Sequence, residues 1–170
     1  MENNITNQEP EKKVVYAGFW WRFLAYLIDE ILISMVEWII VLPILGVMGI
    51  TIFSMQEAGI SEEEMWLWMG PMMGAMFSVI VLSIALNWLY FAIMESSKVQ
   101  GTVGKMILKI KVTDYEGQRI SFGRATGRFF GKIISGMILM IGYIMAGFTE
   151  KKQALHDMMA GCLVIREEPS

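Results

Sequence analysis

Two long stretches of the chain are almost continuously apolar. The 30 residues from Met65 to Met94 contain no Asp, Glu, Lys or Arg. Another uncharged stretch runs from Trp38 to Met55, and a mostly apolar run from Ala17 precedes it. Since about 20 helical residues cross the hydrocarbon core of a bilayer, both stretches are long enough to span it. The pattern predicts membrane-spanning helices at about 19–48 and 65–94, with Pro43 kinking or ending the first.

A third apolar segment, Phe129 to Phe148, is less regular. Lys132 and four glycines interrupt it, and only 17 uncharged residues separate Lys132 from Glu150. We expect a helix at about 124–148, and two arrangements of it remain open. A broken or re-entrant helix that returns to the side from which it came is favoured, because so many glycines permit it. The alternative is a third full span.

The region between the second and third apolar segments is basic, and apolar residues within it recur at every second position. Leu108, Ile110 and Val112 alternate with polar neighbours, which is typical of a half-buried strand. The turn sequence 114–117 and the return 119–122 complete a predicted β-hairpin at about 106–122. A short strand at 162–165 is expected to join it.

Serines mark the starts of two helices. Ser61 is followed three residues later by Glu64, which has the form of a capping box. Ser121 is a plausible N-cap for the third apolar segment. The expected fold is an all-α membrane protein with two spanning helices, a third spanning or re-entrant segment and a small cytoplasmic β-hairpin. Residues 1–15 are expected to be a polar, disordered start, 16–166 the membrane domain, and 167–170 a tail.

The distribution of positive charge predicts the orientation. Three Lys or Arg residues lie at or before the start of the first helix, seven lie between Lys98 and Arg128, and none lies in the acidic connection 54–64. By the positive-inside rule, the N-terminus and the 98–128 region are cytoplasmic and the 54–64 loop is outside. The polar first 13 residues do not have the form of a cleavable signal peptide. We therefore expect a multi-pass membrane protein.

Composition argues against several classes of function. A net charge of −3 and a pI near 5.2 do not favour nucleic-acid binding. The single Cys162 cannot form an internal disulfide, and one histidine is too few for a typical zinc site. The segment 101–105 lacks the glycine spacing of a phosphate-binding loop. The sequence therefore predicts no enzyme, no cofactor and no metal site.

Four ionisable residues lie on one face of the first predicted helix. Ionisable groups inside a span are unfavourable by about 2.5–3.5 kcal/mol on insertion scales, so they usually face protein or water. One interpretation is a cation or proton site, and the favoured one is an electrostatic clasp with the third helix, where three basic residues recur every four positions. The residues of the first helix are Arg22, Asp29, Glu30 and Glu37, and those of the third are Arg124, Arg128 and Lys132.

Three ordered motifs, spread over roughly residues 16–166, are similar to those of the RDD family of small bacterial integral membrane proteins. The first runs from Ala17 to Asp29, the second combines Gly101–Lys105 with the segments 110–114 and 121–125, and the third is Leu155–Gly161. The resemblance implies a compact helical membrane domain in the bacterial cytoplasmic membrane. It also implies that the arginine and two aspartates of the family name correspond to Arg22, Asp29 and Asp157. Transport of unspecified ligands, including sodium–proton exchange, has been proposed for the family.

Two functions from different classes follow. The first is transport of protons or monovalent cations through the acidic face of the first helix. The second is a non-catalytic adaptor or regulator of a larger membrane protein, such as a membrane protease. The expected partners are the lipid bilayer and either copies of the chain or that larger membrane protein.

Overall fold

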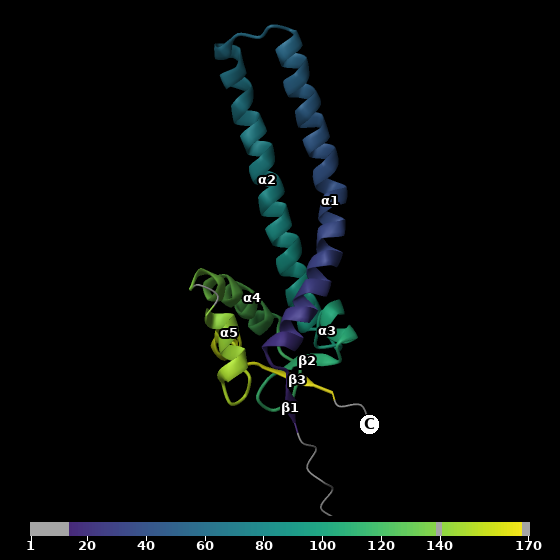
Figure 1. The fold of residues 1–170 in the computed structure, drawn as a ribbon, viewed down its shortest axis with the longest axis vertical. Coiled ribbons are helices and arrows are strands. Elements are labelled where there is room, and N and C mark those ends of the chain that lie inside the picture. Colours follow the sequence, from purple (N-terminus) through teal and green to yellow (C-terminus); the bar gives the residue numbers. More distant parts are fainter. Residues whose placement is uncertain (1–13, 139–140, 168–170) are drawn as a thin grey trace, which may run out of the picture.

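A computed structural model describes residues 14–138 and 141–167 of the chain. Two long helices, α1 (Phe19–Glu57) and α2 (Glu62–Glu95), form a hairpin that rises from a compact base (Figure 1). Both are long and apolar enough to cross a membrane, which confirms the two predicted spans. Most of the predicted start 1–15 and tail 167–170 lies outside the described residues.

The first helix is longer than the sequence predicted. The expected end near residue 48 is wrong, because α1 continues through Pro43 to Glu57. Pro43 removes one backbone hydrogen bond from the helix. Ending the helix there would leave several more backbone groups without partners, and in an apolar environment water cannot replace those bonds. The predicted start of α2 is confirmed: Ser61 Oγ accepts from the Glu64 amide at 3.3 Å, and the Glu64 carboxylate accepts from the Ser61 amide at 3.1 Å.

A three-stranded antiparallel sheet lies at the base of the hairpin. Its strands are β1 (Val15–Tyr16), β2 (Ile110–Thr113) and β3 (Leu163–Arg166), in the order β1-β3-β2. The predicted tail strand therefore exists and joins the sheet. The second strand of the predicted 106–122 hairpin does not, because only a single bridge joins Thr113 to Arg119. Ser121 instead begins the next helix, and β3 takes the place beside β2.

Four shorter helices complete the base: α3 (Val103–Ile107), α4 (Phe122–Met137), α5 (Ile141–Phe148) and α6 (Leu155–Ala160). The helix expected at 124–148 is thus two helices, and they meet at a bend of 102°. A Cβ atom at Gly142 would lie 2.7 Å from Cβ of Ser135, so a glycine is needed where α5 turns back onto α4. Figure 1 shows α4 lying across the lower end of α2.

The sheet constrains how often the chain can cross a membrane. β1 immediately precedes α1, and β3 follows α5 and α6, yet the two strands pair directly through Val15–Arg166 and Tyr16–Ile165. The chain between them must therefore cross a membrane an even number of times. If α1 and α2 each cross a membrane, an α4–α5 pair that returns to its own side meets this condition, and a third full span does not. This geometry favours the re-entrant arrangement over a third full span.

Cysteine labelling tests this arrangement. Cys162 is fully buried and a poor reporter, so exposed single cysteines are placed in a Cys162→Ala background at Glu63, Glu116 and Glu167. Cysteines at 116 and 167 are expected to react with an impermeant maleimide from one side of the membrane, and that at 63 from the other. Labelling of 116 and 167 from opposite sides would mean that α4 and α5 cross.

Candidate functional site

Six charged side chains meet at the base of the hairpin, where α1, α2, α3, α4 and α6 converge. We call them the charge cluster. Five of them are buried or nearly so, in a region whose neighbouring core is made of small and β-branched apolar side chains. Buried charges are stable only when they are paired. The members are Arg22, Glu95, Lys105, Arg128, Lys132 and Asp157.

Asp157 lies at the start of α6 and holds two arginines. Its Oδ2 atom pairs with Nη1 of Arg22, and its Oδ1 atom accepts a hydrogen bond from Nε of Arg128 at 2.7 Å. Oδ2 also accepts from the Ala154 amide at 3.0 Å, so the carboxylate caps its own helix. One fully buried carboxylate thus connects α1, α4 and α6.

Arg22 extends this connection to the backbone. Its Nε atom donates to the Ala17 carbonyl at 2.7 Å, and its Nη2 atom donates to the Lys152 carbonyl at 2.6 Å. A guanidinium has five N–H donors in a fixed plane, which a lysine could not supply in this geometry. Arg22 therefore fixes the start of α1 to the segment before α6.

Glu95, the last residue of α2, is the second centre of the cluster. Its carboxylate pairs with Lys105 and lies 2.6 Å from Nη1 of Arg128. Lys132 is farther away, at 3.8 Å, and its ammonium lies 3.9 Å from the centroid of the Phe91 ring. Arg128 thus bridges Glu95 and Asp157 and unites the two halves of the cluster.

Asp29 is buried on α1 beside the cluster and is satisfied by neutral donors. It accepts hydrogen bonds from Tyr90 Oη at 2.8 Å, Thr102 Oγ1 at 2.5 Å and the Gly104 amide at 2.8 Å. A Cβ atom at Gly104 would lie 2.1 Å from the Ala25 carbonyl oxygen, so only glycine lets α3 approach α1 so closely. The segment 101–105 therefore binds a carboxylate of its own chain.

The electrostatics of the base match this pairing. Burial alone would raise the pKa of the Asp157 carboxyl, but Arg128 and Arg22 hold that pKa well below its usual range. Burial lowers the pKa of the Lys105 ammonium, and Glu95 opposes that effect. Burial also lowers the pKa of His156, to about 3, so this ring is neutral at pH 7. Its Nδ1 atom lies 3.3 Å from Ser135 Oγ.

Comparison with known proteins identifies the family. The model of the RDD family matches residues 16–161, which is most of the chain. The chain belongs to the RDD family. It is 40% identical to the uncharacterized protein YxaI of Bacillus subtilis over 149 residues, which cover 88% of this chain and 96% of YxaI. It is 30% identical to the uncharacterized membrane protein YteJ of the same organism, over 90% of this chain and 82% of YteJ. No solved structure matches.

The three charges expected from the RDD motif occupy two neighbouring sites. Arg22 and Asp157 form an ion pair, although 135 positions separate them in the sequence. Asp29 belongs instead to the hydrogen-bonded contact between α1, α2 and α3. The motif residues of this RDD protein therefore hold its base together.

The predicted clasp between the acidic face of α1 and the basic face of α4 has different partners. Arg128 and Lys132 meet Glu95 and Asp157, which lie on α2 and α6. The remaining predicted residues lie apart from the cluster: Glu30 is exposed on α1, Glu37 accepts from Asn87 Nδ2 at 2.8 Å, and Arg124 lies 3.9 Å from Asp114. The clasp prediction was wrong because spacing along one helix does not reveal which helix faces it.

Sequence reasoning overlooked Glu95 and the donors to Asp29. The signal for Glu95 was present, since it is the first charged residue after the 30 uncharged residues of α2. A carboxylate at that position has to find cations at the end of the span. Thr102 and Tyr90 carried no comparable signal. Among the described residues, no group of three or more His, Cys, Asp or Glu side chains is arranged to hold a metal ion.

Asp157→Asn is expected to destabilise the protein strongly. It would leave Arg22 and Arg128 without the carboxylate between them, and breaking a buried ion pair lowers the free energy of unfolding by about 3–5 kcal/mol. Denaturant unfolding in detergent micelles measures the change. Arg124→Gln is the control, because its side chain is 52% exposed and its surface pair contributes less than about 1 kcal/mol. Equal losses in the two variants would contradict the assignment.

Proposed function

We propose that this RDD protein is a non-catalytic membrane adaptor or regulator that docks its α1–α2 hairpin against the transmembrane helices of a larger membrane protein. One observation carries the proposal. None of the most apolar 18-residue stretch of α1 is buried, and only 11% of that of α2. The buried charges of the base are paired with one another, whereas the hairpin has almost no packing of its own.

The sequence of α2 supports association with another helix. Gly70 and Gly74 lie four residues apart on one face, and a Cβ atom at either would meet no atom within 4 Å in the described chain. Lipid tails are as apolar as leucine, so helices associate in membranes mainly where small residues let their backbones approach. This pair of glycines gives the partner helix a place to pack.

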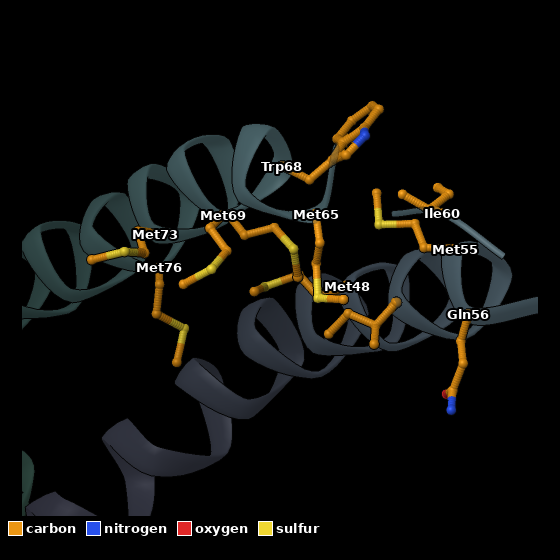
Figure 2. Close-up of a pocket in the computed structure, with 11 residues that line it drawn as sticks. Met48, Met55, Gln56, Ile60, Met65, Trp68, Met69, Met73 and Met76 are labelled. Atoms are coloured by element: carbon orange, nitrogen blue, oxygen red, sulfur yellow. The ribbon is translucent and has the colours of Figure 1, made fainter. Parts of the chain in front are cut away.

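A methionine-lined cavity of about 610 Å³ lies between the outer ends of α1 and α2 (Figure 2). Side chains of both helices line it, among them Met48, Met55, Met65, Met69 and Met73. Methionine is unbranched and flexible, so a surface rich in it adapts to side chains of different shapes. We propose that side chains of the partner fill this cavity.

The orientation forms part of the proposal. The basic region 98–128 belongs to the base, and the helix ends that flank the turn between α1 and α2 are acidic, with Glu57 on α1 and Glu62–Glu64 on α2. By the positive-inside rule, the base faces the cytoplasm of a bacterial cell and the hairpin tip faces outward. The glycine pair and the methionine-lined cavity then lie in the outer half of the membrane.

Co-purification of matched variants tests the docking proposal. Gly74→Leu blocks the glycine face of α2, and Ala75→Leu adds an apolar side chain at the next, exposed position. We expect one stoichiometric membrane-protein partner with the wild type and with Ala75→Leu, and its loss with Gly74→Leu. A clean homo-oligomer that both variants form equally well would contradict the proposal.

Cation or proton transport is the second candidate. The hydrogen bond from Asn87 in the last third of α2 to Glu37 in the middle of α1 favours it, since polar groups inside a span often mark an ion pathway. From Trp38 to Gln56, however, α1 carries no charged residue, and α2 carries none from Met65 to Met94. A pathway through the outer half would need groups from other chains.

Flux measurements distinguish this candidate. Asp29 is a poor target, because its three hydrogen bonds hold α1 to α2 and α3. Glu37→Gln removes a charge and keeps an acceptor for Asn87. Transport predicts proton or sodium flux in everted vesicles for the wild type and its loss in Glu37→Gln at equal protein level. Absence of flux in both proteins would exclude transport and leave the adaptor proposal standing.

A further inference from the structure

A second cavity, of about 350 Å³, opens beside the charge cluster. Residues of all six helices line it, with α1 and α2 contributing only from their ends near the base. Basic and aromatic side chains predominate among these residues. Its size is at the lower end of the range for small-molecule sites, about 300–1,000 Å³. We propose that this cavity binds the acidic phosphate headgroup of a membrane lipid.

Basic side chains predominate among the charged residues that line the cavity. Four of them line it, whereas only one of its lining residues is a carboxylate, and two further carboxylates pair with the basic groups from outside the lining. Asp29 is already satisfied by three hydrogen bonds, and the other two carboxylates each face at least two cations. The charged lining is therefore suited to an anion. The cations are Arg22, Lys105, Arg128 and Lys132, and the carboxylates are Asp29, Glu95 and Asp157.

Lys132 is the basic group best placed to bind an anion. The one carboxylate oxygen within 4 Å of its ammonium among the described residues is Glu95 Oε1, at 3.8 Å, and Lys105 already pairs with that oxygen. The other face of the ammonium rests on the Phe91 ring. An ammonium has three N–H donors, and a phosphate oxygen in the cavity would satisfy those that Glu95 does not.

The rest of the cavity suits the chain of a lipid. Phe23 and Ile144 line it and are 43% and 46% exposed, so its rim is continuous with the apolar surface of α1 and α5. On α4, the apolar side chains of Phe130, Ile133 and Met137 are exposed as well. A helix with one apolar exposed face, placed across the end of a membrane hairpin, lies at the depth of the lipid headgroups.

A lipid is favoured over a free anion because the cavity has both charged and apolar lining residues. Lys105 and Arg128 are buried in the lining, whereas Phe23 and Ile144 are exposed at its rim, which suits a molecule with an acidic head and a hydrocarbon tail. A free phosphate would leave the aromatic and aliphatic lining in contact with water. The inference does not depend on the adaptor proposal, because the cavity belongs to the base and not to the hairpin tip.

Lipid binding to the purified full-length protein tests the inference. The protein in non-ionic detergent is titrated with phosphatidylglycerol or phosphatidylcholine, and native mass spectrometry counts the bound lipids. We expect one phosphatidylglycerol per chain, bound at least about tenfold more tightly than phosphatidylcholine. Lys132→Gln is expected to weaken that binding by about tenfold, the effect of one charge-assisted hydrogen bond. Lys132→Arg is expected to retain it.

Two further variants provide the controls. Arg124→Gln removes a positive charge from the same helix without touching the cavity and is expected to bind as the wild type does. Ile144→Trp fills the rim of the cavity, keeps every charge and is expected to abolish lipid binding. If Lys132→Gln fails to fold, this variant still tests whether the lipid binds in the cavity. Equal weakening by Arg124→Gln and Lys132→Gln would overturn the inference. So would equal binding of the two lipids, or displacement of the bound lipid by millimolar inorganic phosphate.

Discussion

The ion pair between Arg22 and Asp157 is the contact on which the rest of this RDD protein depends. It joins the first turn of α1 to the last helix of the chain, and Arg128 extends it to Glu95 at the end of α2. Charges removed from water are stable only with partners, so each of these side chains requires the others. The ends of both spanning helices are therefore held in one place by the same cluster.

This constraint separates the molecule into two parts with different physical character. In the base, charges are paired, glycines such as Gly104 allow close backbone contact, and three strands from distant parts of the chain form one sheet. The outer part of the hairpin has none of these features and presents apolar side chains over its whole length. Such a division suits a protein whose base is a fixed platform and whose membrane helices pack against other helices.

The sequence predicted the spans, the caps at Ser61 and Ser121, and the tail strand, because these depend on local pattern and hydropathy. It did not predict how the ends of the helices pair, since that depends on contacts between residues far apart in the chain. Asp157 was recognisable only by resemblance to a family, and its contact with Arg22 required the fold. Glu95 was overlooked because a single carboxylate at the end of a span has no periodic pattern. The expected clasp failed because spacing along one helix does not reveal which helix faces it.

A double-mutant cycle on Arg22 and Asp157 tests the central claim most directly. The free energy of unfolding is measured in detergent for the wild type, Arg22→Gln, Asp157→Asn and the double variant. If the two side chains form the buried pair, the double variant loses less than the two single variants together, by about 1–3 kcal/mol. Losses that add to within about 0.5 kcal/mol would show that the residues act independently, and the account of the base would then be wrong.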